Sequence, residues 1–180
     1  LRWFNDDAAH KVLALASATN GEGRSFIAAN LAIVFAQQGQ RTLLIDGDLR
    51  HPRQHALFGL GRSAGLSGIL AERANLQDAA VAVPGLSGLT VLPAGAVPPN
   101  PQELLGRTSF ATLLDAAATE FDVVIIDTPA GSEFADAEII AARAGAAAIV
   151  SFKNVSSLPA TALLSRRRQD GGVVLVGSIL

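Results

Sequence analysis

The residues best suited to chemistry lie at positions 19–26, where a polar turn rich in glycine follows a short apolar run. The run, residues 12–16, has the length of a buried strand, and the apolar stretch at residues 27–38 has that of a helix. A glycine turn between a strand and a helix can wrap its N–H groups around an anion, and the helix N-terminus adds partial positive charge. Arg24 would add a full charge, and the Ser25 hydroxyl could ligate Mg²⁺. The stretch therefore predicts a phosphate-binding loop.

This loop departs from the pattern G-x-x-x-x-G-K-[ST] at two positions. Ala18 stands where the pattern has its first Gly, and Arg24 stands where it has Lys. Taken alone, the stretch is also compatible with an ordinary turn between a strand and a helix. Residues elsewhere in the chain are needed to distinguish the two interpretations.

Carboxylates follow two other apolar runs. Asp46 and Asp48 come after residues 41–45, and Asp127 comes after residues 123–126. Aspartate is also common in turns, which is the simpler interpretation of each site. However, the carboxyl ends of the strands form the edge at which open α/β sheets bind ligands. Three such features at one edge favour a binding site over three unrelated turns.

The order of apolar segments predicts the fold class. Strands alternate with helices, and each strand is almost continuously apolar, which is typical of a mainly parallel sheet covered by helices on both faces. We therefore expect an α/β, doubly wound fold in a single domain. Further helices are expected at residues 51–58, 65–72, 101–105, 110–119, 135–142 and 157–169, and further strands at residues 89–92, 146–152 and 173–179.

Local patterns outside the motifs give three smaller expectations. Asn100 as N-cap, with Pro101 at the first helical position and Glu103 at the third, predicts a helix start resembling a capping box. Asp136 is expected on a helix away from the phosphate-binding loop. His51 and His55 are expected on a solvated face rather than as metal ligands.

Composition limits the class of protein. The 180 residues are 49% apolar with a net charge of −2, which predicts one domain with a cooperative core and does not favour nucleic acid as a partner. The absence of Cys excludes disulfides and thiolate metal sites within this sequence. The longest uncharged span, residues 79–102, contains five prolines, so it is not expected to form a membrane-spanning helix. We expect a soluble chain.

Five stretches together resemble one known family. ASATNGEGRSF, LLIDGDLRHP and VVIIDTPA resemble the Walker A, A′ and B motifs of the bacterial tyrosine kinases (BY-kinases), which are the cytoplasmic ATPase domains of polysaccharide co-polymerases. PAGAVPPNPQELL and GLSGILAE also resemble stretches of that family. The likeness runs from Val12 to the last expected strand and is strongest to the EpsG-like, chain-length-determinant branch. It implies a P-loop NTPase fold of the deviant Walker type over residues 1–180.

The resemblance also implies a site for ATP or ADP with Mg²⁺. The implied catalytic residues are Arg24, Asp46 and Asp48, with Asp46 as the base that orients or deprotonates an attacking hydroxyl. The implied ligands of Mg²⁺ are Ser25, Asp48 and Asp127. The implied nucleotide-binding residues are Thr19, Asn20, Gly21, Glu22, Gly23, Arg24, Ser25 and Phe26.

The implied function is that of an ATPase and protein-tyrosine kinase domain regulating exopolysaccharide chain length, polymerisation or export. The implied partner is a membrane-embedded polysaccharide co-polymerase, which would hold the domain at the cytoplasmic side of the inner membrane. Members form rings through a helix that would precede Leu1, so a homo-oligomer is expected only with that segment. They also autophosphorylate a tyrosine cluster behind the last strand; these 180 residues contain no Tyr, so this stretch cannot be its own substrate.

Two alternatives remain. A positioning ATPase of the ParA/MinD type would share the A′ and B motifs, but it usually has a second Lys early in its P-loop, and residues 18–20 contain none. A nucleotide-sensing module without turnover is the other alternative. Arg24 keeps it open, because a planar, forked guanidinium does not replace the compact ammonium of Lys without consequence.

Overall fold

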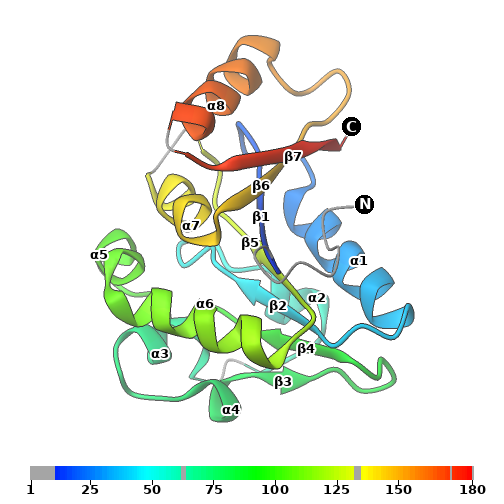
Figure 1. Cartoon of the computed structure of the whole chain (residues 1–180), viewed down its shortest axis with the longest axis vertical. Coiled ribbons are helices and arrows are strands. Elements are labelled where there is room, and N and C mark those ends of the chain that lie inside the picture. The colour runs from blue at the N-terminus through cyan, green and yellow to red at the C-terminus, as the bar shows by residue number, and fades with distance from the viewer. Residues whose placement is uncertain (1–10, 62–63, 132–134, 171, 180) are drawn as a thin grey trace.

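The central element is a seven-stranded sheet. A computed structural model describes residues 11–61, 64–131, 135–170 and 172–179, and in it the strands lie in the order β3-β4-β2-β5-β1-β6-β7 (Figure 1). All neighbouring pairs are parallel except β3 with β4. The strands are β1 (Val12–Ala16), β2 (Thr42–Asp46), β3 (Val81–Ala82), β4 (Leu89–Leu92), β5 (Val123–Asp127), β6 (Ala146–Val150) and β7 (Val174–Ile179).

Helices cover both faces of this sheet (Figure 1). They are α1 (Arg24–Gln37), α2 (Gln54–Leu57), α3 (Gly65–Leu70), α4 (Leu76–Ala79), α5 (Pro101–Gly106), α6 (Thr108–Glu120), α7 (Asp136–Ala144) and α8 (Leu158–Asp170). The predicted α/β, doubly wound architecture is confirmed. In the part of the chain that the structure describes, none of these helices combines the length and apolarity needed to cross a bilayer.

The two faces of the sheet follow from side-chain alternation along each strand. In β1, Leu13 and Leu15 pack with Ala28 and Ala32 of α1 in one buried cluster. Val12 and Ala14 belong to the cluster on the opposite face, together with side chains from α5, α6 and α7. Because both faces are covered, the central strands are buried at every position, which explains their continuous apolar sequence.

The central strands end at the same edge of the sheet. Asp46 of β2 lies in register with Asp127 of β5, and Leu15 of β1 lies in register with Asp127 from the other side. The loop that follows β1 and the two acidic strand ends are therefore neighbours. This is the juxtaposition that the sequence predicted for its three motif segments.

Four local details differ from the sequence-based expectations. The helix expected at residues 51–58 is only four residues long, Gln54–Leu57. The short helix α4 and strand β3 were not predicted, because four and two residues are too few to show a periodicity. The helix at Pro101 does begin after Asn100, but the Asn100 side chain does not cap a backbone N–H. Instead its amide donates to the Glu103 carboxylate, so the predicted capping-box arrangement is wrong in this respect.

Candidate functional site

The loop after β1 has the backbone that the glycine pattern predicts. Gly21 and Gly23 have φ values of 81° and 80°, a region that side chains with a Cβ rarely adopt, so glycine is needed at both turns. Gly23 is the N-cap of α1, no side chain caps this end, and no acidic residue lies in its first turn. The N-terminal N–H groups and the positive end of the helix dipole are thus available to an anion.

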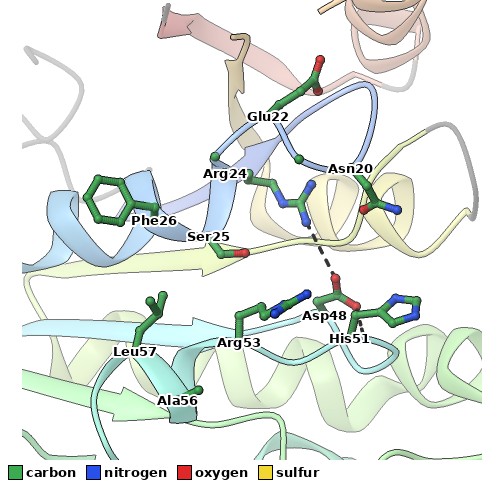
Figure 2. A pocket seen from close by; sticks show the side chains of 12 residues that line it. Asn20, Glu22, Arg24, Ser25, Phe26, Asp48, His51, Arg53, Ala56 and Leu57 are labelled. Atoms are coloured by element: carbon green, nitrogen blue, oxygen red, sulfur yellow. Dashed lines mark hydrogen bonds and ion pairs between the residues drawn. The ribbon is translucent and has the colours of Figure 1, made fainter. Parts of the chain in front are cut away.

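A cavity of about 650 Å³ opens in front of this loop. Figure 2 shows that loop residues form one wall and residues following β2 form the other. The Phe26 ring lies at one end, and its side chain is 62% exposed. The lining residues are Asn20, Gly21, Glu22, Gly23, Arg24, Ser25, Phe26, Asp48, His51, Arg53, Ala56 and Leu57.

Thr19 and Glu22, two of the implied nucleotide-binding residues, form a hydrogen bond with each other within the loop. The Thr19 N–H donates to Glu22 Oε2 at 2.8 Å, which closes the turn from within. Glu22 is almost fully buried, and its other carboxylate oxygen has no partner among the described residues. This contact removes one N–H from those that could face a ligand.

Arg24 is buried and bridges the loop to the acidic strand ends. Its Nε donates to Asp127 Oδ1 at 3.2 Å, and its Nη1 donates to Ser17 Oγ at 2.5 Å. Its Nη2 lies 3.7 Å from Asp48 Oδ2, the interaction drawn as a dashed line in Figure 2. The guanidinium therefore lies close enough to both carboxylates to compensate part of their charge.

Asp127 lies at the centre of the polar cluster and is fully buried. Burial raises the pKa of its carboxyl group, while Arg24 and hydrogen bonds from Ser25 and Gln54 oppose that rise. The Gln54 amide donates to Asp127 Oδ2 at 2.8 Å. The carboxylate thus has donors on both oxygens yet no contact with bulk solvent.

Asp46 lies beside Asp127 and is also fully buried. Desolvation, and next the charge of Asp127, raise the pKa of Asp46 to about 7. The backbone N–H groups of Arg53 and Gln54 donate to its Oδ2 at 3.0 and 2.9 Å. Its Oδ1 has no partner among the described residues.

Asp48 faces the cavity and is fixed by the turn that follows it. Its Oδ1 accepts hydrogen bonds from the N–H groups of Arg50 and His51 at 3.1 and 2.9 Å. The Arg50 guanidinium in turn contacts both carboxylate oxygens of Asp136, at 2.8 and 3.2 Å. Asp136 is fully buried. Asp136 lies on α7, as expected, and no contact joins its side chain to residues 19–26 among the described residues. Through Arg50 it helps to hold the Asp48 turn, a contact that the sequence did not predict.

The structure brings most of the implied site residues together and adds several. Asn20, Gly21, Glu22, Gly23, Arg24, Ser25, Phe26 and Asp48 line the cavity, with Asp46 and Asp127 buried behind it. Sequence reasoning missed Ser17, Arg53 and Gln54. Arg53 follows the Asp-Gly-Asp turn closely, which was a usable signal; a Gln at the start of a four-residue helix gave none. His51 lines the cavity but is exposed, and the residues described contain no cluster of three His, Cys, Asp or Glu able to hold a metal ion.

Comparison with known proteins shows the family to which this chain belongs. The family described as "Cellulose biosynthesis protein BcsQ" matches residues 10–176. Tyrosine-protein kinase YwqD of Bacillus subtilis is 43% identical over 134 residues, which are 74% of this chain and 56% of YwqD. The chain therefore corresponds to little more than half of that relative.

Solved structures give the same grouping. The kinase domain of Escherichia coli tyrosine kinase ETK superimposes with a TM-score of 0.92 at 34% identity, over 97% of this chain and 68% of that one. The septum site-determining protein MinD from Pyrococcus horikoshii, complexed with Mg-ADP, has a TM-score of 0.82 at 24% identity over 95% of this chain and 70% of that one, a likeness of fold alone.

The fold and the glycine loop define a P-loop NTPase. Within that class, the chain belongs to the bacterial tyrosine-kinase domains, with a BcsQ-like family match over most of its length.

Proposed function

We propose that this chain binds Mg·ATP at residues 19–26 and catalyses phosphoryl transfer to tyrosine, as a kinase domain regulating exopolysaccharide chain length, polymerisation or export. The observation that carries the proposal is the uncapped N-terminus of α1, which lines one cavity together with Asp48, while the buried carboxylates of Asp46 and Asp127 lie behind that cavity. Membership of the tyrosine-kinase domains supplies the class of reaction. Phosphoryl transfer in such sites depends mainly on positioning and on neutralising charge.

The oxygen donors at the cavity fit Mg²⁺ when phosphate oxygens complete the set. Mg²⁺ in proteins is usually held by one or two carboxylates together with substrate phosphates and water. Ser25 and Asp48 line the cavity, and Asp127 accepts a hydrogen bond from Ser25. We assign Ser25, Asp48 and Asp127 as the residues that hold Mg²⁺. The ion, when bound, would neutralise charge on the phosphates.

Arg24 has two alternative sets of partners in this proposal. Without nucleotide it compensates Asp48 and Asp127, at 3.7 and 3.2 Å. It also lines the cavity, so a bound phosphate would offer the guanidinium a second anionic partner. Movement of Arg24 toward phosphate would free both carboxylates, which couples nucleotide binding to Mg²⁺ binding.

Asp46 is the proposed base. A general base is most effective when its pKa lies near the working pH, and burial raises the pKa of Asp46 to about 7. Its Oδ1 is buried and has no hydrogen-bond partner among the described residues, while two backbone N–H groups hold Oδ2. That arrangement would leave one oxygen to orient or accept the proton of a tyrosine hydroxyl.

The partner and the location are further parts of the proposal. We infer that the domain acts at the cytoplasmic side of the inner membrane, bound to a membrane-embedded polysaccharide co-polymerase. The length of tyrosine-protein kinase Etk of Escherichia coli supports this indirectly. This chain spans only 23% of that relative, so most of Etk is left for other parts, such as a membrane part. Light scattering should show a monomer in dilute solution that assembles when a segment upstream of Leu1 or the cytoplasmic tail of the co-polymerase is added; a stable ring from these 180 residues alone would contradict this.

Two assays on one sample test the function. Calorimetric titration with ADP and ATP should give at least about tenfold tighter binding with Mg²⁺ than with EDTA, the size expected when charged metal contacts are lost. A Glu/Tyr copolymer with Mg·ATP should gain phosphotyrosine. Absence of nucleotide binding would overturn the site assignment.

A second candidate is a nucleotide-sensing module without turnover. The position of Arg24 favours it, because a guanidinium held by Asp127 and Ser17 replaces the flexible ammonium of the usual P-loop Lys. Mg²⁺-dependent binding without phosphotyrosine or phosphate release would support this candidate. A ParA/MinD-type ATPase is less favoured, since residues 18–20 contain no Lys.

A further inference from the structure

Gln54 contacts all three motif segments of the site. Its backbone N–H donates to Asp46 Oδ2 at 2.9 Å. Its side-chain Nε2 donates to the Ser25 carbonyl at 3.0 Å and to Asp127 Oδ2 at 2.8 Å. These partners are 8, 29 and 73 residues away in the sequence. One side chain thus ties the end of β5 to the first turn of α1, while its own backbone holds the end of β2.

The chemistry of this position is unusual for core packing alone. Gln is mostly an exposed residue, yet Gln54 is fully buried. Both partners of its Nε2 are acceptors, so the amide nitrogen must face them and the orientation of the amide is determined. The amide oxygen then has no partner among the described residues. Leaving a buried acceptor unpaired is costly, and an apolar side chain of similar size would avoid that cost.

The two Nε2 contacts act on atoms that determine the shape of the site. Asp127 Oδ1 is held by Arg24, so the Gln54 bond to Oδ2 fixes the second oxygen and hence the plane of the carboxylate. The bond to the Ser25 carbonyl fixes the turn from which the Ser25 hydroxyl projects. Without Gln54, Asp127 could rotate further toward Arg24.

We propose that Gln54 is a positioning residue for the Mg·nucleotide site: its amide holds Asp127 and the first turn of α1 at one spacing, so that the Asp127 carboxylate and the Ser25 hydroxyl meet the same ion. This inference rests on the proposed function. It assigns Gln54 no contact with nucleotide, and it attributes to the residue an effect on the Mg²⁺ dependence of binding rather than on nucleotide binding itself.

Two variants separate this role from ordinary packing. Gln54→Leu removes both side-chain donors but keeps the N–H that contacts Asp46; Gln54→Asn keeps an amide on a shorter stem. The quantity measured is the ratio of the ADP dissociation constant in EDTA to that in Mg²⁺, by calorimetry. Gln54→Leu should lower this ratio about tenfold, the loss typical when a group that orients a metal ligand is removed. The constant in EDTA should stay within about twofold, and Gln54→Asn should be intermediate.

Gln102→Leu is the matched control, because Gln102 is an exposed residue of α5. Its ratio should equal that of the wild type. A folded Gln54→Leu variant with an unchanged ratio would overturn the inference, even if its melting temperature fell, since only packing would then be affected. If Gln54→Leu does not fold, a wild-type ratio in Gln54→Asn would overturn it. Mg²⁺-independent binding by the wild type would overturn the proposed function, and this inference with it.

Discussion

Two arginine–aspartate pairs lie at opposite ends of the same strands. Arg41 and Asp122 immediately precede β2 and β5, and their side chains meet at 2.6 Å. Arg24 and Asp127 meet at 3.2 Å where β5 ends. The first pair is exposed, at 61% and 34%, and the second is buried, at 7% and 0%. The shorter pair is thus the one in contact with water.

The distance between the two charged groups does not decide how much each pair contributes to stability. Water already solvates Arg41 and Asp122, so their contact adds little stability beyond aligning two strand starts. At the other end, Arg24 and Asp127 are both buried, so neither can be solvated by water if its partner is removed. Removing one of the two side chains therefore leaves the other as an uncompensated buried charge. Buried carboxylates that are compensated by Arg24 are poorly suited to be a structural support, but they are well suited to respond to an incoming ion.

The largest effect should come from Arg24→Ala. It leaves Asp48 and Asp127 buried without their cation, which typically costs about 3–5 kcal/mol of unfolding free energy. The same change removes a phosphate contact, so ATP affinity should fall roughly ten- to a hundredfold. Denaturant unfolding and calorimetry measure the two effects, and millimolar Mg²⁺ should restore part of the stability. Unchanged ATP affinity would mean that the guanidinium never meets phosphate.

The next effect concerns Asp46 and pH. Because the pKa of Asp46 is raised from 3.8 to about 7 on folding, the unfolded chain loses this proton first as pH rises. The ionisation of Asp46 therefore lowers the free energy of unfolding progressively as the pH rises from about 4 to about 7, and this loss does not increase further above pH 7. Asp46→Asn mimics the protonated form, so it should be about 2 kcal/mol or more stabilising at pH 8 and near neutral at pH 4. Urea unfolding across this range tests it, and an equal effect at both pH values would contradict the assignment.

A smaller effect is expected from Asp127→Asn on Mg²⁺. The variant keeps an acceptor for Arg24 but loses the charge, so the Mg²⁺ dependence of ADP binding should fall about tenfold. Asp115→Asn, at an exposed position of α6, is the control and should bind as the wild type does. Asp136 would be unsuitable as a control because it holds Arg50.

The smallest effect should come from Arg41→Ala. The exposed pair lowers the pKa of Asp122 to about 2, so its contribution is present above about pH 4 and is lost as pH falls toward 2. At neutral pH the variant should lower the melting temperature by at most about 3 °C. Its nucleotide affinity and Mg²⁺ dependence should match the wild type. A loss comparable to that of Arg24→Ala would remove the distinction between the two ends.

The sequence was sufficient for the fold and for the backbone of the site. Continuous apolar strands indicated a covered parallel sheet, and Gly21 and Gly23 adopt the backbone that their pattern predicted. The arrangement of Arg24 could not be predicted, because a side chain that can reach phosphate can equally reach Asp127, and only the register of β1, β2 and β5 places that carboxylate nearby. The contact between Asp136 and Arg50 could not be predicted for the same reason, since the two residues are 86 positions apart in the sequence.

The most direct test is a crystal structure of the chain with Mg·ADP. We expect the phosphates against the N–H groups of residues 20–25 and Mg²⁺ beside Ser25 and Asp48. We also expect the Arg24 guanidinium to have left Asp127 Oδ1, 3.2 Å away in the structure described here, for a phosphate oxygen. Nucleotide bound elsewhere, or phosphates in this cavity with Arg24 still on Asp127, would contradict the account of how the buried cluster functions.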